Sequence, residues 1–343
     1  MSVSLRARSA LAHGDRSFFG PVPFAIFQQN VRVNVRRIVF VLPGGGARGM
    51  IQAAALAKIE QMLGMQIFQL ANLIIGGSVG SIIGGMLAAG VKATIVEQLF
   101  YNNAKSYFPR TNSITNILLR LVTGNNSLYD AQAIVSDVLT YSSGAKMRDM
   151  RCPYVAVTAN VNTRMPLLMS SEDPIYQNKF LADVVANSFA APYFFGLRNN
   201  DIDQITYGDP GIGGDANPIM IAWTEVIRRG WHQDGITDIY MIGTGLPNNY
   251  TPYSETRKWG FIRQSVKTLR FAAEESDATN QHYAEYFDML LSNVNIYTLN
   301  PTLDGPADFA NVSKIDYYSK LGSQAVDSID LDPLIARRAE LLG

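Results

Sequence analysis

A serine set between glycines is the feature of this sequence that most directly suggests chemistry. Residues 76–80 read GGSVG, a Gly-x-Ser-x-Gly pattern between an apolar run typical of a strand and one typical of a helix. At such a turn the serine lies on a strained elbow, and the amino end of the helix stabilises developing negative charge. The pattern predicts a nucleophile at Ser78, with Gly76 and Gly80 as the elbow glycines. A glycine-rich turn that only allows close packing is the alternative.

A second glycine-rich loop follows the first predicted strand. Residues 44–49 read GGGARG, which has the glycine spacing of phosphate-binding loops. A P-loop would need lysine and a hydroxyl residue where Met50 and Ile51 stand. A dinucleotide site would need an acidic residue between Glu60 and Glu97, and the sequence has none there. The backbone N–H groups of this loop, at the start of a helix, instead suit an oxyanion hole.

A serine nucleophile needs a base, and the chain has three histidines. His13 lies in a basic N-terminal segment, His232 at a predicted helix end, and His282 on a late amphipathic helix. Asp209 is a further candidate, because the glycines around it in residues 207–214 allow close approach of another backbone. Its alternative role is that of an ordinary turn cap.

The elements that must hold these residues alternate between strands and helices. Apolar runs predict buried strands at residues 38–42, 70–75, 153–158 and 239–242. Helical patterns occur at residues 50–63, 81–89, 131–139 and 218–229, and later at 256–273 and 279–291. This alternation predicts an α/β fold, with a mostly parallel central sheet and helices on both faces.

Composition narrows the class of protein. Charged residues make up 17% of the chain, below the roughly 25% of an average soluble domain, which favours membrane contact or self-association. Basic and acidic residues balance at 29 each, so no overall field attracts the chain to nucleic acid. The single cysteine, Cys152, permits no internal disulfide and suits a reducing compartment. Glutamines and glycines interrupt the uncharged stretch at residues 61–91, so we interpret it as a buried strand and helix rather than a membrane span.

Three regions are expected along the chain. Residues 1–36 form a basic N-terminal arm without the sustained apolar run of a signal peptide. Residues 37–300 form the catalytic domain, and residues 301–343 a C-terminal extension packed on it. Two segments could contact lipid: the apolar residues 114–122 as a docking flap, and the basic helix near residues 257–270 as a headgroup site. Core packing and a solvated face are their respective alternatives.

Taken together, these motifs resemble the patatin-like phospholipase family. Six segments occur in the family's order over residues 37–250: residues 44–49, 76–80, 155–163 and 188–195 (SFAAPYFF), the Asp209-Pro210-Gly211 turn with Asn217-Pro218, and residues 243–245. The chain departs from the family pattern at Pro43, where an acidic residue often stands, and at Pro210, where a glycine usually follows the aspartate. The resemblance implies a patatin-like three-layer sandwich related to the α/β-hydrolases.

The resemblance also implies a mechanism that uses neither cofactor nor metal. A Ser78–Asp209 dyad would hydrolyse acyl esters of glycerophospholipids, as a phospholipase A or lysophospholipase does, through an acyl-enzyme. The oxyanion hole would be formed by the glycine loop, that is by Gly44, Gly45, Gly46 and Arg48. Burial would raise the pKa of Asp209 and make it a better base.

Two other functions stay open at this point. One is an α/β-hydrolase esterase with a Ser78-Asp209-His282 triad, whose chain order the sequence satisfies. The other is a catalytically silent lipid- or nucleotide-sensing module, suggested by the proline at position 210. The expected partners are a phospholipid membrane in peripheral contact, with an activating ligand or protein and a homo-oligomer as further options, and no nucleic acid polymer. The expected location is cytoplasmic, with membrane association in the active state.

Overall fold

A mixed sheet forms the centre of the structure. The computed structural model describes residues 35–108, 129–192, 194–247, 252–258, 260, 278–288, 291–305 and 309–343, all within the unit Val31–Gly343. Within these residues, eight strands form one sheet in the order β5-β6-β3-β2-β1-β7-β9, with β4 paired to β3. They are β1 (Arg36–Leu42), β2 (Leu73–Gly77), β3 (Tyr154–Asn160), β4 (Met165–Ser170), β5 (Arg198–Asn200), β6 (Ile205–Gly208), β7 (Ile236–Ile242) and β9 (Val294–Leu299). The short β8 (Leu246–Pro247) and β10 (Thr302–Leu303) pair separately.

Parallel pairing brings the ends of the central strands to one edge. β3, β2, β1, β7 and β9 are parallel in that order, with Leu42 opposite Gly76 and Gly76 opposite Ala156. The loops that follow these strands therefore lie side by side at what we term the carboxyl edge. β4 and β6 run antiparallel to β3, and β5 antiparallel to β6. The predicted α/β fold is confirmed, with these antiparallel strands as an addition.

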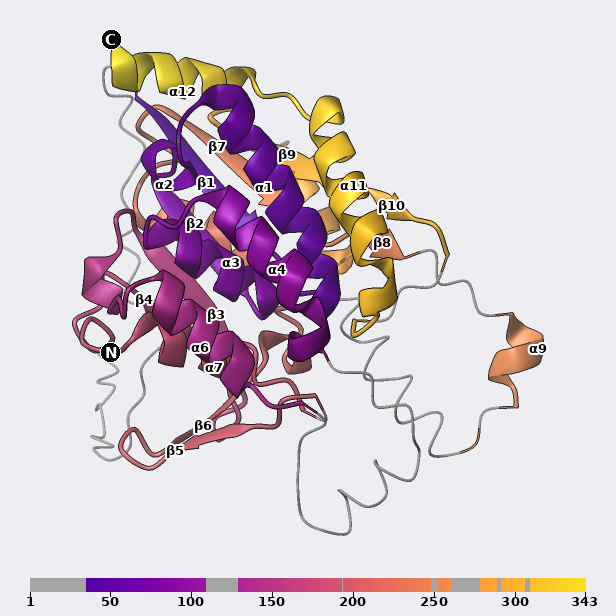
Figure 1. Cartoon of the computed structure of the whole chain (residues 1–343). Coiled ribbons are helices and arrows are strands. Elements are labelled where there is room, and N and C mark those ends of the chain that lie inside the picture. The colour runs from indigo at the N-terminus through magenta and orange to yellow at the C-terminus, as the bar shows by residue number, and fades with distance from the viewer. Residues whose placement is uncertain are drawn as a thin grey trace, which may run out of the picture. The chain divides into compact units, whose positions relative to one another are not determined.

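Helices cover both faces of the sheet, because alternate residues of each strand point to opposite sides. Phe40 and its even-numbered neighbours on β1 face one helical layer, whereas Val39 and Val41 pack with Trp223 of α8 on the other. Figure 1 shows α1, α3, α4 and α11 gathered on one side of the sheet. The helices are α1 (Gly49–Leu63), α2 (Ile67–Leu70), α3 (Val79–Ala88), α4 (Ala93–Tyr107), α6 (Gln132–Tyr141), α7 (Leu181–Ser188), α8 (Ile219–Arg228), α9 (Tyr253–Thr256), α11 (Ile315–Ala325), α12 (Asp332–Leu342) and helical residues 278–288.

The predicted start of the second strand, at residue 70, is wrong. Residues Ile67–Leu70 form the helical turn α2, and the strand begins only at Leu73. The reason is a capping box, in which the Gln66 N–H donates to the Gln69 side chain at 2.9 Å and so starts a helix. The helices expected at 50–63, 81–89, 131–139 and 218–229 are found to within two residues at each end.

The C-terminal helices contribute to the main core. α11 packs along α1, and Tyr318, Val326 and Leu334 are buried in the same apolar cluster as α1 and α3. The division between domain and extension at residue 300 stays a prediction. Residues 1–34 of the expected N-terminal arm and the flap at residues 114–122 lie outside the described residues, as does most of the expected helix at 256–273. Arg36, the last residue of the expected arm, is the first residue of β1.

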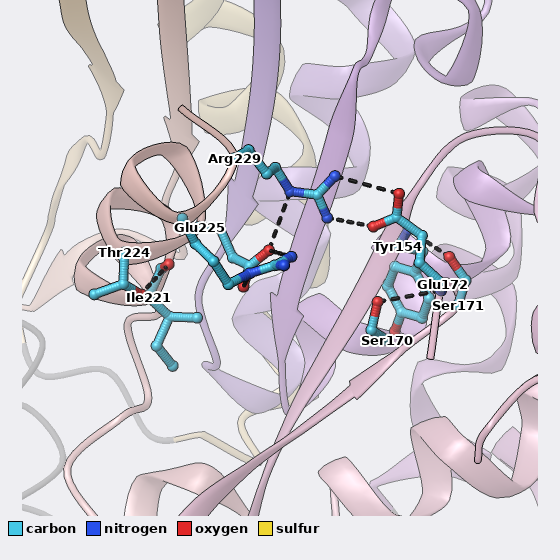
Figure 2. A network of polar contacts seen from close by, with 9 residues as sticks. Tyr154, Ser170, Ser171, Glu172, Ile221, Thr224, Glu225 and Arg229 are labelled. Atoms are coloured by element: carbon cyan, nitrogen blue, oxygen red, sulfur yellow. Dashed lines mark hydrogen bonds and ion pairs between the residues drawn. The ribbon is translucent and has the colours of Figure 1, made fainter. Parts of the chain in front are cut away.

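A charged network ties α8 to the turn after β4. The Arg229 guanidinium contacts the carboxylates of Glu225, on α8, and of Glu172, as Figure 2 shows. Glu225 is buried, which by itself would raise its pKa, but Arg228 and Arg229 hold that pKa below its ordinary value. This network lies near the start of β3, away from the carboxyl edge, and we assign it a structural role.

Candidate active site

Ser78 occupies a strained turn between β2 and α3. Its backbone has φ 53° and ψ −125°, a region that costs a non-glycine residue on the order of 1–3 kcal/mol. The turn is crowded: a Cβ at Gly80 would collide with the Leu42 carbonyl oxygen, and one at Gly76 with the Gly80 carbonyl oxygen. The elbow predicted from the sequence therefore has the expected backbone and needs both glycines.

Asp209 reaches Ser78 from an antiparallel strand. β6 ends at Gly208, opposite Ala159 of β3, so the next residue lies at the carboxyl edge. The Asp209 side chain is 7% exposed and receives a hydrogen bond from the Gly211 N–H at 2.8 Å. The Ser78 hydroxyl lies close enough to this carboxylate to lower its pKa. Burial raises the pKa of Asp209 to about 6, and Ser78 and the Gly211 N–H partly oppose that rise.

Pro210 is compatible with this geometry. Asp209 has φ −59° and ψ 137°, the extended conformation that a following proline favours. Pro210 is the first residue of a short 3-10 helix (Pro210–Ile212), where its missing N–H costs nothing and Asp209 is the N-cap. The departure from the family pattern thus leaves the carboxylate beside Ser78.

The glycine loop lies against the elbow, and it offers fewer donors than the sequence predicted. Gly44 packs so closely on Ser78 that a Cβ there would be 3.0 Å from the serine Cβ. Its own N–H donates to the Ala216 carbonyl at 2.8 Å and is not available to a substrate. The N–H groups of Gly45 and Gly46 have no acceptor among the described residues. The predicted set of oxyanion donors is therefore narrowed to these two.

Arg48 holds the glycine loop through its guanidinium group. It is 3% exposed, donates to the carbonyls of Gly45 at 3.4 Å and Gly245 at 3.3 Å, and lies over the Phe309 ring. Thr244 also holds the glycine loop, because its hydroxyl donates to the Gly44 carbonyl at 2.9 Å. The loops after β1 and β7 are thereby fixed to each other.

Comparison with protein families identifies the family of this chain. Residues 40–223, more than half of the chain, match the family model described as patatin-like phospholipase, and this stretch includes both Ser78 and Asp209. The chain belongs to the patatin-like phospholipase family.

Individual relatives share only low sequence identity with this chain. A cGAMP-activated phospholipase of Vibrio cholerae serotype O1 is 26% identical over 248 residues, which cover 65% of this chain and 69% of the relative. A cGAMP-activated phospholipase of Escherichia coli is 27% identical over 222 residues, 60% of this chain and 61% of the relative. Among solved structures, VipD from Legionella pneumophila is similar with 12% identity and a TM-score of 0.40, over 85% of this chain and 67% of VipD. The chain thus spans only about two thirds of the length of these relatives.

Among the residues that the structure describes, neither His232 nor His282 forms a hydrogen bond with Ser78 or Asp209. His282 is exposed on the helical residues 278–288, with its ring against Tyr286. His232 precedes β7 and so lies at the edge of the sheet opposite Ser78. His13 is outside the described residues.

Two further findings concern metal and membrane. In the part of the chain that the structure describes, no three His, Cys, Asp or Glu side chains gather where they could share a metal ion. No helix among the described residues combines the length and apolarity needed to span a bilayer.

Sequence reasoning missed two residues that hold the pair. Ser188 accepts a hydrogen bond from the Ser78 N–H at 3.0 Å, and the Ala190 carbonyl accepts one from the Asp209 N–H at 3.0 Å. The only available signal was that both lie in the SFAAPYFF block of the family. The sequence of that block could not show which residues Ser188 and Ala190 contact, because their partners lie in other segments of the chain.

Proposed function

We propose that this protein hydrolyses acyl esters of glycerophospholipids with Ser78 as the nucleophile and Asp209 as the general base. The observation that carries the proposal is that the Ser78 hydroxyl, at a strained elbow within a patatin-like chain, lies close enough to the buried Asp209 carboxylate to lower its pKa. An isolated turn cap would not need a serine partner in such a costly backbone conformation.

The reaction would proceed in two halves. The Ser78 Oγ attacks the ester carbonyl carbon while its proton passes to Asp209, and the resulting oxyanion binds the N–H groups of Gly45 and Gly46. Protonated Asp209 then gives its proton to the departing alcohol oxygen of the lysophospholipid, which leaves an acyl-enzyme. A water molecule, deprotonated by Asp209, attacks this ester, and the fatty acid is released with Ser78 regenerated.

The surroundings of the pair support these roles. The pKa of about 6 means that Asp209 is ionised at neutral pH yet more basic than an ordinary aspartate. Ser78 precedes α3, whose ten residues present their positive dipole end to the developing oxyanion. Arg48 supports this chemistry indirectly, by holding the loop that carries the two donors.

Substrate, regulation and location are part of the same proposal. The relatives from Vibrio cholerae and Escherichia coli are named as cGAMP-activated, and we propose that a cyclic nucleotide also raises the activity of this chain. Phospholipid in a bilayer as substrate would require peripheral membrane contact, and we propose a cytoplasmic protein that associates with the membrane when active.

The test is release of fatty acid from mixed phospholipid vesicles, measured by mass spectrometry with EDTA present and with or without cGAMP. We expect fatty acid and lysophospholipid from the wild type, more with cGAMP, and none from Ser78→Ala. Ser171→Ala is the matched control, because this serine is buried and its hydroxyl accepts a hydrogen bond from the Tyr154 N–H at the start of β3, away from the elbow. Turnover by Ser78→Ala would place the nucleophile elsewhere.

The silent-module alternative is separated by a fluorophosphonate probe, which reacts with activated serines. A silent module would leave Ser78 unlabelled, whereas the proposed enzyme becomes labelled at Ser78 in the wild type and not in Ser78→Ala.

A further inference from the structure

Ser188 is a buried hydroxyl with two backbone partners, one of them at the elbow. It is the last residue of α7 and is fully buried. Its hydroxyl donates to the Val157 carbonyl of β3 at 2.5 Å and accepts the Ser78 N–H at 3.0 Å. Because the hydroxyl proton is directed to Val157, an oxygen lone pair is left to face Ser78. The side chain therefore links the elbow to the neighbouring strand.

The same short segment holds the base. Two residues after Ser188, the Ala190 carbonyl accepts the Asp209 N–H at 3.0 Å. The Thr158 hydroxyl, next to Val157 on β3, lies 2.9 Å from the Asn187 carbonyl oxygen and 2.8 Å from that of Gly208. Residues 187–190 are thus attached to β3, to the elbow and to the residue that carries the carboxylate.

Phe189 anchors this segment from the other side. Its ring packs edge-on against Phe195 at 5.1 Å, and Phe195 contacts the rings of Phe108 and Tyr129. The Tyr129 N–H donates to the Phe194 carbonyl at 2.7 Å, which closes the segment onto the chain before α6. Residues 188–192 and 194–195 are consequently held against the core.

We propose that Ser188 is a positioning residue for the reaction. Its hydroxyl holds the Ser78 main chain in the strained elbow conformation, and residues 188–190 set the spacing between the Ser78 hydroxyl and the Asp209 carboxylate. A strained peptide whose N–H loses its acceptor relaxes by rotation, and a small rotation at Ser78 moves its Oγ away from the carboxylate. The inference rests on the proposed function, because it concerns the geometry of the same pair.

The experiment compares Ser188→Ala with a matched control at the opposite edge of the sheet. Ser171 is also buried, and its hydroxyl accepts a strand N–H, that of Tyr154, at 3.0 Å (Figure 2). Ser171→Ala removes an equivalent hydrogen bond far from Ser78. Both variants should lose thermal stability, Ser188→Ala the more because its hydroxyl also donates to Val157, and only Ser188→Ala should lose catalysis.

Two measurements are made on full-length protein: kcat and KM on phospholipid vesicles, and the rate of fluorophosphonate labelling at Ser78. For Ser188→Ala we expect kcat and the labelling rate to fall about tenfold or more with little change in KM. For Ser171→Ala we expect values close to wild type. Ser188→Cys keeps a similar side-chain volume, and its thiol is a weaker hydrogen-bond acceptor. Its kcat and labelling rate should therefore fall less, and it replaces Ser188→Ala in the test if that variant does not fold.

The failures of the two proposals are distinguishable. Labelling of Ser188→Ala and Ser188→Cys at the wild-type rate would overturn the positioning role and leave Ser78 as the nucleophile. Equal loss of kcat in Ser188→Ala and Ser171→Ala would reduce Ser188 to a structural residue. A wild-type protein that does not label at Ser78 would instead overturn the proposed function.

Discussion

The Asp209 carboxyl group is buried, yet it must be ionised to accept a proton. Its pKa of about 6 reconciles these demands, because at neutral pH the group is mostly charged and still a stronger base than a solvated aspartate. If Asp209 is the base, kcat/KM rises with pH through about 6 and is level above it. A histidine base would place the limb near 6.5. Because these two values are close, the pH profile barely distinguishes a Ser78–Asp209 dyad from a Ser78-Asp209-His282 triad. Substitutions at Asp209 and His282 are needed to distinguish them.

At the level of single residues, we predict opposite outcomes for Asp209 and His282. Asp209→Asn should lower kcat by orders of magnitude, because an amide cannot take up the Ser78 proton. His282→Ala should leave most activity, since the imidazole contacts Tyr286 at an exposed site. His232→Ala is the control for loss of a histidine at the far edge of the sheet. In a triad the histidine takes the proton, so an inactive but folded His282→Ala would reverse the assignment.

At the level of elements, the elbow depends on the approach of α3 to the end of β1. Replacing Gly80 with alanine forces a methyl group against the Leu42 carbonyl, so α3 must shift. We expect Gly80→Ala to lower the free energy of unfolding by about 1–3 kcal/mol and to abolish fluorophosphonate labelling. The control is Gly260→Ala, because a Cβ at Gly260 would meet no atom of the described residues within 4 Å. A Gly80→Ala protein with normal labelling would show that the elbow tolerates a displaced helix.

The antiparallel strand β6 is the other element on which the site depends. The parallel strands place their following loops at the carboxyl edge as a matter of topology. Asp209 reaches that edge only because β6 runs in the opposite direction and ends there, with Gly208 paired to Ala159. The proposed base and nucleophile thus follow strands of opposite direction, β6 and β2, that both pair with β3.

For the whole molecule, the raised pKa of Asp209 links catalysis to stability. A carboxyl group whose pKa is raised on folding favours the folded state below its unfolded value of 3.8 and loses that contribution as pH rises through about 6. This shift corresponds to about 3 kcal/mol of destabilisation once Asp209 is ionised. The wild type therefore retains, at neutral pH, a buried charge that lowers its stability and that the proposed mechanism would use.

Asp209→Asn should accordingly be more stable than the wild type at pH 8, by up to about 3 kcal/mol, and the difference should shrink toward pH 4. Urea denaturation across this pH range measures it, with Ser78→Ala as the variant that retains the ionisable group. A stability difference that does not change with pH would contradict the shifted pKa. An inactive yet stabilised Asp209→Asn would fit a functional role for the buried carboxylate.

Local patterns in the sequence were enough to predict the elbow, the glycine loop and the alternation of strands and helices. Each of these depends on neighbours within a few residues: Ser78 between its glycines, or an apolar run of five followed by a helical period. The family resemblance added Asp209 as a partner, but local reasoning from that turn left a simple cap equally open.

Only the tertiary structure decided which groups meet. Ser78 and Ser188 are 110 positions apart, and no local pattern encodes a hydrogen bond of that separation. Gly44 was predicted as an oxyanion donor, yet Ala216, delivered from another loop, already occupies its N–H. Arg48 was predicted as part of the oxyanion hole, and its guanidinium donates to the Gly45 carbonyl and to that of Gly245, in the loop after β7. Residue type and spacing define what each group can do, whereas the pairing of distant strands determines which partner it finds.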